Sequence, residues 1–249
     1  MSKTENGKTS LKKKMTEFMA KIVAKEFRLN EMEADGFFQY EAVVEGSRLA
    51  GGKVRVVLAV GPNGSGKSLL GRMMESVIRN EGAAFRMVSM KNRTSGLMGQ
   101  RFVFGSEDDG ATGLNTVAAV ELLLNNMTKE SDTGGGGGLD EPTLGLSAEY
   151  SLGVGAEVAR VLATAPKHFL FVSSHDRLFV RGLIEGLQAA GIGWAFVEFG
   201  GSTENKGAAA WMDKEIEHKP WSDLSKRKKH AHTMWQKVQA VLTAKNKAK

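Results

Sequence analysis

The chain has 249 residues, of which 41% are apolar and 25% are charged, a composition typical of a soluble domain with a sizeable core. It contains no cysteine, which excludes disulfide bonds, cysteine-ligated metal centres and a thiol nucleophile and favours a cytoplasmic location. The net charge is +6, but residues 214–249 carry ten basic and three acidic side chains, so the rest of the chain is close to neutral.

A basic N-terminal extension is expected at residues 1–35. No apolar segment follows its basic start, and no apolar stretch is long enough to cross a membrane, so we expect neither a secretory signal nor a membrane span. Apolar residues from 11 to 27 recur at helical spacing, with lysines on the other face. This pattern predicts a helix packed on the core; a helix that contacts DNA or a membrane surface is the alternative.

A strand, a loop and a helix are expected next. An extended segment with aromatic side chains covers residues 37–45. The sequence VRVVLAV at Val54–Val60 is a continuous apolar run, typical of a parallel strand buried on both faces. A glycine-rich stretch and helically periodic apolar residues at 69–78 follow it. This order indicates the start of a βαβ unit.

Helices and short strands alternate through the rest of the chain. Helices are predicted at residues 117–124 and 178–190, and strands at 169–172 and 194–199. The alternation predicts an α/β fold with a mostly parallel sheet flanked by helices. Beyond it, apolar residues at helical spacing predict a helix within a basic C-terminal tail at residues 214–249.

A phosphate-binding loop is indicated by the sequence GPNGSGKS, which matches the Walker A pattern G-x-x-x-x-G-K-[ST]. Glycines let successive backbone N–H groups point at phosphate oxygens, and the following helix adds the positive end of its dipole. We expect Lys67 to reach the β- and γ-phosphates and Ser68 to ligate Mg²⁺. The residues expected to bind nucleotide here are Gly61, Pro62, Asn63, Gly64, Ser65, Gly66, Lys67 and Ser68.

An acidic pair and a histidine complete the expected site. Asp140 and Glu141 are consecutive, and His175 follows the strand predicted at 169–172. We expect Asp140 to hold Mg²⁺ through water, and Glu141 to orient or deprotonate the water that attacks the γ-phosphate. His175 is expected to hydrogen-bond the γ-phosphate or that water. These residues predict a site for ATP and Mg²⁺ with ATPase activity.

Three motifs together resemble the ABC ATPase superfamily, and more closely the ATPase domain of MutS mismatch-repair proteins. These are the Walker A loop, DEPTLGLS and SSHDRLF. The spacing is compact, with 73 residues from Lys67 to Asp140 and 35 from Asp140 to His175. Transporter-type ABC domains have a helical subdomain in the first interval. The resemblance implies a P-loop NTPase with an ABC/MutS-type core at residues 36–213, between helical extensions at 1–35 and 214–249.

The stretch at residues 108–117 resembles the MutS signature motif, which in that family completes the nucleotide site of the other subunit. The resemblance therefore implies a homodimer in which Asn115 and Thr116 approach the γ-phosphate of the partner chain. Asn115 stands where that motif has serine, and its amide can still donate a hydrogen bond. Pro142 replaces the isoleucine usual after the acidic pair in MutS proteins.

Five consecutive glycines occupy residues 134–138, where a strand is expected before Asp140. Each glycine in a strand costs about 0.5–1 kcal/mol relative to alanine, so the run costs roughly 2.5–5 kcal/mol. Two explanations are open. Either large neighbouring side chains fill the space, or the strand becomes fully ordered only when nucleotide or a partner is bound.

The function implied by the resemblance is an ATPase that dimerises around ATP–Mg²⁺ and couples hydrolysis to a DNA transaction such as repair, recombination or genome processing. The basic tail is expected to contact DNA. The alternative for the tail is that its helix covers the core or docks a partner protein. The alternative function is a nucleotide-gated subunit with weak ATPase activity that controls assembly with a partner protein. Phe37, Phe38 and Tyr40 are the candidates for stacking on adenine, with core packing as the alternative.

Overall fold

The computed structural model describes residues 40–43, 54–63, 65–80, 84–89, 112–130, 135–199 and 207–214, together with residues 222, 233 and 236. The extension at 1–35, the aromatic residues Phe37 and Phe38, the loop residue Gly64, the first part of the signature stretch at 108–111 and almost all of the tail at 214–249 lie outside the described residues.

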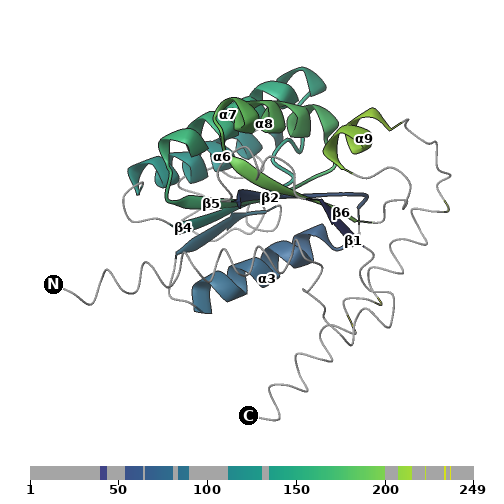
Figure 1. Cartoon of the computed structure of the whole chain (residues 1–249), viewed down its shortest axis with the longest axis horizontal. Helices are drawn as coiled ribbons and strands as arrows, with labels where there is room; N and C mark the ends of the chain where they lie inside the picture. The colour runs from purple at the N-terminus through teal and green to yellow at the C-terminus, as the bar shows by residue number, and fades with distance from the viewer. Residues whose placement is uncertain are drawn as a thin grey trace, which may run out of the picture.

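A six-stranded sheet lies at the centre of the described protein (Figure 1). Its strands are β1 (Tyr40–Val43), β2 (Val54–Val60), β3 (Phe85–Val88), β4 (Gly135–Asp140), β5 (His168–Ser174) and β6 (Gly193–Phe199). The strand order is β1-β6-β2-β5-β4-β3. The five strands from β6 to β3 run parallel, and β1 pairs antiparallel with β6 at one edge. The predicted α/β class with a mostly parallel sheet is therefore confirmed.

Helices cover both faces of the sheet, as parallel strands require (Figure 1). The helices are α3 (Lys67–Asn80), α6 (Thr112–Lys129), α7 (Ala148–Thr164), α8 (Arg177–Ala189) and α9 (Ala208–Asp213). Helix α3 lies on one face, while α6, α7 and α8 cover the other. The short helix α9 packs beside α8. None of the described helices is long and apolar enough to span a membrane.

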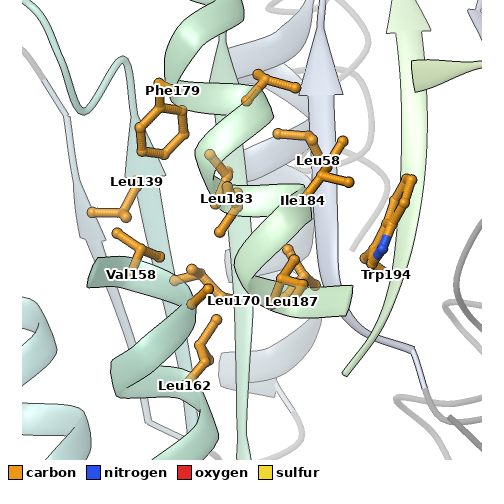
Figure 2. Close-up of a cluster of buried hydrophobic side chains, with 14 of the residues drawn as sticks. Leu58, Leu139, Val158, Leu162, Leu170, Phe179, Leu183, Ile184, Leu187 and Trp194 are labelled. Atoms are coloured by element: carbon orange, nitrogen blue, oxygen red, sulfur yellow. The ribbon is translucent and has the colours of Figure 1, made fainter. Parts of the chain in front are cut away.

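The larger of two hydrophobic clusters lies between the sheet and helices α6, α7 and α8, and Figure 2 shows its centre. Strands β2, β4 and β5 contribute Leu58, Leu139 and Leu170, and α8 contributes Phe179 and Leu183. A smaller cluster fills the space between the sheet and α3. Strands β2 and β5 bury side chains on both faces, which explains the apolar runs at Val56–Val60 and Phe169–Val172.

The elements predicted within the described residues are present, with differences at their ends. Strand β2 has the predicted bounds, whereas the helix predicted at 117–124 extends over Thr112–Lys129 because its polar first and last turns continue the helix beyond the apolar run. Strand β3 and helix α7 were not predicted. The strand is only four residues long, and the glycines of α7 interrupt its apolar pattern.

Four glycines of the run, at positions 135–138, form a regular strand together with Leu139 and Asp140. Strand β4 pairs in register with β3 on one side and with β5 on the other. A Cβ atom at Gly136 would lie 2.5 Å from Cδ2 of Phe85, and one at Gly137 would lie 3.3 Å from methyl groups of Leu123 and Leu170. Large neighbouring side chains therefore occupy the space above the glycines, which is the first of the two explanations.

Candidate functional site

The residues predicted to bind nucleotide meet at one edge of the sheet. Parallel strands have their carboxyl ends at the same edge, which is where open α/β sheets bind ligands. Strand β2 ends before the glycine loop that leads to Lys67, β4 ends at Asp140, and β5 ends at Ser174 beside His175. Because β5 lies between β2 and β4 in the sheet, three distant parts of the sequence converge there.

The loop between β2 and α3 depends on glycine at two described positions. Gly61 has a φ of 135° and Gly66 a φ of 108°, in the left-handed region that other residues rarely adopt. A Cβ atom at Gly61 would also lie 2.5 Å from the carbonyl oxygen of Phe199. Between them the loop turns tightly, and the N–H of Ser65 donates to the carbonyl of Pro62 at 3.3 Å, while Asn63 is exposed. Glycine at these two positions therefore permits the backbone conformation of the described part of the loop.

Lys67 is the first residue of α3, and its side chain is only 5% exposed. Its ammonium group donates to the carbonyls of Gly61 at 2.7 Å and Pro62 at 3.2 Å, and lies 3.4 Å from Oε1 of Glu141. A buried charge needs such partners because burial removes its hydration. The ammonium thus lies between the loop and the acidic pair, where a positive charge suits a polyphosphate ligand.

Ser68 and Asp140 form the second group. The Ser68 hydroxyl lies 3.0 Å from both carboxylate oxygens of Asp140. Hydroxyl and carboxylate oxygens are hard donors, and Mg²⁺ is commonly held by one or two carboxylates together with water and substrate phosphates. The described residues contain no group of three or more acidic, histidine or cysteine side chains that would hold a metal without such additional ligands. The pair therefore fits Mg²⁺ that arrives with a nucleotide.

Ser173 is a member of this group that the sequence argument missed. It pairs with Asp140 in the β4–β5 register, and its hydroxyl donates to Oδ1 of Asp140. The signal available in the sequence was a serine at the end of a buried apolar strand, two residues before His175. The parallel register decides which carboxylate that serine contacts.

Glu141 and His175 form a hydrogen-bonded pair. His175 Nδ1 lies 2.8 Å from Oε2 of Glu141, and the backbone N–H of His175 donates to the same oxygen at 3.2 Å. Glu141 has a φ of 53°, which is uncommon for a residue other than glycine and occurs often at functional sites. Its N–H donates to the carbonyl of Ser173 at 2.9 Å. This conformation directs its carboxylate to both Lys67 and His175.

The ionisation of this pair is coupled. Burial alone would raise the pKa of Glu141, but the hydrogen bond from His175 and the charge of Lys67 outweigh it, and the pKa of Glu141 lies below its ordinary value. The hydrogen bond to Glu141 raises the pKa of His175 against the opposing effect of burial. Both shifts favour a carboxylate that faces an imidazolium.

Asp176 directly follows His175 and anchors the start of α8. Its carboxylate accepts hydrogen bonds from the N–H groups of Leu178 at 3.0 Å and Phe179 at 3.2 Å, and so caps the start of α8. The hydroxyl of Thr143 donates to its other oxygen at 2.8 Å. An aspartate before an apolar helix is a recognised N-cap signal, so the sequence alone could have identified Asp176 as an N-cap. The contact with Thr143 joins α8 to the turn after Glu141.

Asn115 and Thr116, the two residues of the signature stretch expected to approach a partner's nucleotide, lie in the first turns of α6. Thr116 is fully buried, and its hydroxyl donates to the carbonyl of Leu144 at 2.8 Å within the same chain. A Cβ atom at Gly113 would lie 2.5 Å from the carbonyl oxygen of Gly145, so the helix packs closely on the turn that follows β4. Asn115 is only partly buried. The structure therefore gives Thr116 a contact inside its own chain and leaves Asn115 nearer to solvent.

Of the candidate adenine-stacking aromatics, Tyr40 begins strand β1, at the edge of the sheet beside β6.

No model of a known protein family matches the chain, and no curated protein matches it. The arrangement of residues at the carboxyl edge of the sheet therefore carries the functional argument.

Proposed function

We propose that the chain is a P-loop ATPase with an ABC/MutS-like core that binds ATP with Mg²⁺ and hydrolyses it. The observation that carries this proposal is the meeting of Lys67, the Ser68–Asp140 pair and the Glu141–His175 pair around the glycine loop. Phosphoryl transfer to water needs a positive charge to bind the phosphates, oxygen ligands for Mg²⁺ and a carboxylate to orient the water. They lie at the edge of the sheet where α/β folds bind ligands.

The proposed reaction divides these roles between the residues. The loop N–H groups and Lys67 would bind the phosphates, and Ser68 and Asp140 would hold Mg²⁺, which would supply positive charge against the phosphates when bound. Water attacks the γ-phosphorus, the bond to the β–γ bridging oxygen breaks, and ADP leaves with that oxygen. Glu141 orients the water and accepts its proton, and His175 holds the carboxylate in place.

The ionisation state of Glu141 affects the attack of water on the γ-phosphorus. Its lowered pKa keeps the carboxylate ionised at neutral pH but makes it a weak base, which favours orientation of the water over early proton removal. Lys67 contributes to that lowered pKa. When the ammonium turns to a phosphate, we expect the pKa of Glu141 to rise and the carboxylate to become a better base.

The dimer and DNA parts of the proposal rest on different evidence. The resemblance of residues 108–117 to the MutS signature supports a homodimer around two ATP–Mg²⁺, with Asn115 as the residue that reaches the partner's nucleotide because Thr116 is buried. The basic tail at 214–249 supports a contact with DNA. Together they support an ATPase that acts in a DNA transaction.

The central test uses purified protein with ATP and Mg²⁺. We expect Glu141→Gln to lower turnover on the order of 10²–10⁴-fold while ATP still binds, because only the water-activating group is lost. Lys67→Ala should weaken ATP binding itself. On size-exclusion chromatography, Glu141→Gln with ATP–Mg²⁺ should elute as a dimer, both with and without DNA. Unchanged turnover in both variants would overturn the catalytic assignment, and a monomer under these conditions would overturn the dimer.

A nucleotide-gated interaction subunit is the second candidate function. The observation that favours it is Asn115, an amide where the resembling family places a serine hydroxyl near the γ-phosphate, because this change is suited to slow turnover. Steady-state ATPase rates with and without DNA separate the two candidates. Turnover stimulated by DNA supports the first, and tight ATP binding with negligible turnover in both conditions supports the second.

A further inference from the structure

The face of β4 that is turned to α3 carries glycine at positions 136 and 138, and side chains of β3 cover both. A Cβ atom at Gly138 would overlap the sulfur of Met87, and Phe85 lies against both glycines. Met87 and Phe85 are two residues apart on one strand, so they share a face. The glycines of β4 therefore make the room that these two side chains fill.

Met87 also reaches α3. Its terminal methyl group lies 2.9 Å from the position that a Cβ atom of Gly71 would take, and Cε1 of Phe171 lies 2.6 Å from the same point. Glycine at position 71 thus lets α3 approach the sheet closely. The side chain of Met87 extends from β4 at Gly138 to α3 at Gly71, with its sulfur at one end and its methyl group at the other.

These two glycines are close in sequence to the proposed Mg²⁺ ligands. Gly71 lies three residues after Ser68, on nearly the same side of α3, and Gly138 lies two residues before Asp140, on the same face of β4. Met87 therefore occupies the space between the two backbone segments that carry Ser68 and Asp140. The hydroxyl and carboxylate at the ends of those segments lie 3.0 Å apart.

We propose that Met87 is a positioning residue that sets the separation of Ser68 and Asp140. The consequence for Mg²⁺ rests on the proposed function, whereas the effect on the Ser68–Asp140 hydrogen bond does not. An unbranched thioether side chain fills an irregular gap well, and leucine has a similar volume. Met87 is partly buried, and alanine would remove its contacts at Gly138 and Gly71, so that α3 and β4 could shift relative to each other. A shift of a few tenths of an ångström is enough to weaken a hydrogen bond or a near-octahedral Mg²⁺ site.

The first test needs no nucleotide and uses thermal unfolding. The change in Tm caused by Ser68→Ala is measured in the wild type, in Met87→Ala and in Met87→Leu. Any effect of the substitution on helix propensity is equal in the three backgrounds and cancels. We expect the effect of Ser68→Ala in Met87→Ala to differ from that in the wild type by at least about 2 °C, because the hydrogen bond is already weakened there. Met87→Leu should restore the wild-type effect. Equal effects in all three backgrounds would overturn the proposal.

The second test measures binding of a fluorescent ATP analogue as Mg²⁺ is titrated. Met87→Ala and Gly138→Ala should each raise the Mg²⁺ concentration for half-maximal binding on the order of tenfold, while any binding measured in EDTA stays within about twofold of the wild type. Gly137→Ala is the matched control, since it adds the same methyl group on the opposite face of β4, against Leu123 and Leu170. An unchanged Mg²⁺ requirement in Met87→Ala would refute the role toward Mg²⁺. If the wild type binds no ATP, the proposed function fails, and the thermal cycle still decides the role of Met87.

Discussion

At the scale of single residues, the site contains three neighbouring ionisable side chains, with the acidic Glu141 between the basic Lys67 and His175. Lys67 contacts Glu141, and Glu141 contacts His175. Lys67 and Glu141 are mostly buried, with side chains 5% and 16% exposed, whereas His175 is 52% exposed. Lys67 and Glu141 are therefore shielded from solvent, and His175 is open to it. This gradient suits a site where a nucleotide enters from outside and meets fixed groups inside.

The pKa shifts predict how this pair contributes to stability as pH changes. The lowered pKa of Glu141 gives stability that is present above about pH 4.3 and is lost as pH falls through the folded-state pKa. The raised pKa of His175 gives stability that is present below about pH 6.5 and is lost as pH rises through the folded-state pKa. We expect the difference in Tm between the wild type and His175→Gln to be largest between these values and to shrink toward about pH 9.

Thermal unfolding of both proteins across this range of pH is the measurement. Arg160→Gln serves as the control, because the pair formed by Arg160 and Glu157 is a surface ion pair without a histidine, and its effect should stay constant from about pH 6.5 to 9. A difference for His175→Gln that does not change with pH would contradict the coupled ionisation.

At the scale of elements, the contact between α7 and α8 positions the start of α8 at the carboxyl edge of the sheet. Gly155 of α7 packs against the backbone of α8, where an added Cβ atom would lie 2.6 Å from the N of Leu183. Gly182 of α8 packs in the same way against the backbone of Leu152. Helix α8 begins at the Asp176 cap, directly after His175. A change in the distance between these helices would therefore move the histidine.

Alanine substitutions at two glycines of α7 test this helix contact, because only one of the two positions has room for a methyl group. Gly153→Ala adds a methyl group with no atom within 4 Å, so it should raise the free energy of unfolding by about 0.5–1 kcal/mol through helix propensity. Gly155→Ala places the same methyl group against α8 and should lower the free energy of unfolding by about 1–3 kcal/mol. Urea denaturation measures both. Equal changes in the free energy of unfolding for the two substitutions would contradict the close packing of α7 against α8.

At the scale of the whole molecule, helix α9 and the first residue of the basic tail pack beside the start of α8. Helix α9 is held against α8 by Arg177, whose guanidinium lies 5.7 Å from the ring centroid of Trp211 and donates to the carbonyl of Lys214. Arg177 is two residues after His175. Lys214, the first residue of the basic tail, is therefore held beside the start of α8.

Deletion of residues 215–249 tests the role of the tail and keeps Lys214. The deleted part carries nine basic and three acidic side chains, so we expect weaker DNA binding and a flatter dependence of log K on log salt. ATP binding should persist because the site residues lie before Lys214. Replacement of the basic cluster at 226–229 by alanine should give part of the same loss. Unchanged DNA affinity after both changes would remove the tail from the proposal.

Local patterns in the sequence determined the strands β2, β5 and β6, the glycine loop and the residues placed around it. The apolar runs and the glycine spacing are properties of neighbouring residues, so they could be predicted without tertiary contacts. The same patterns identified Asp140, Glu141 and His175 as candidates, because each follows or ends a predicted strand.

Only the tertiary structure decided how these residues meet. The contact of Ser173 with Asp140 depends on the register between β4 and β5, and the burial of Thr116 depends on how α6 packs against the turn near Leu144. The glycine strand was open to two explanations until Phe85 and Met87 were placed over it. Each of these features joins segments that are far apart in the chain, and packing between distant segments leaves no local pattern in the sequence.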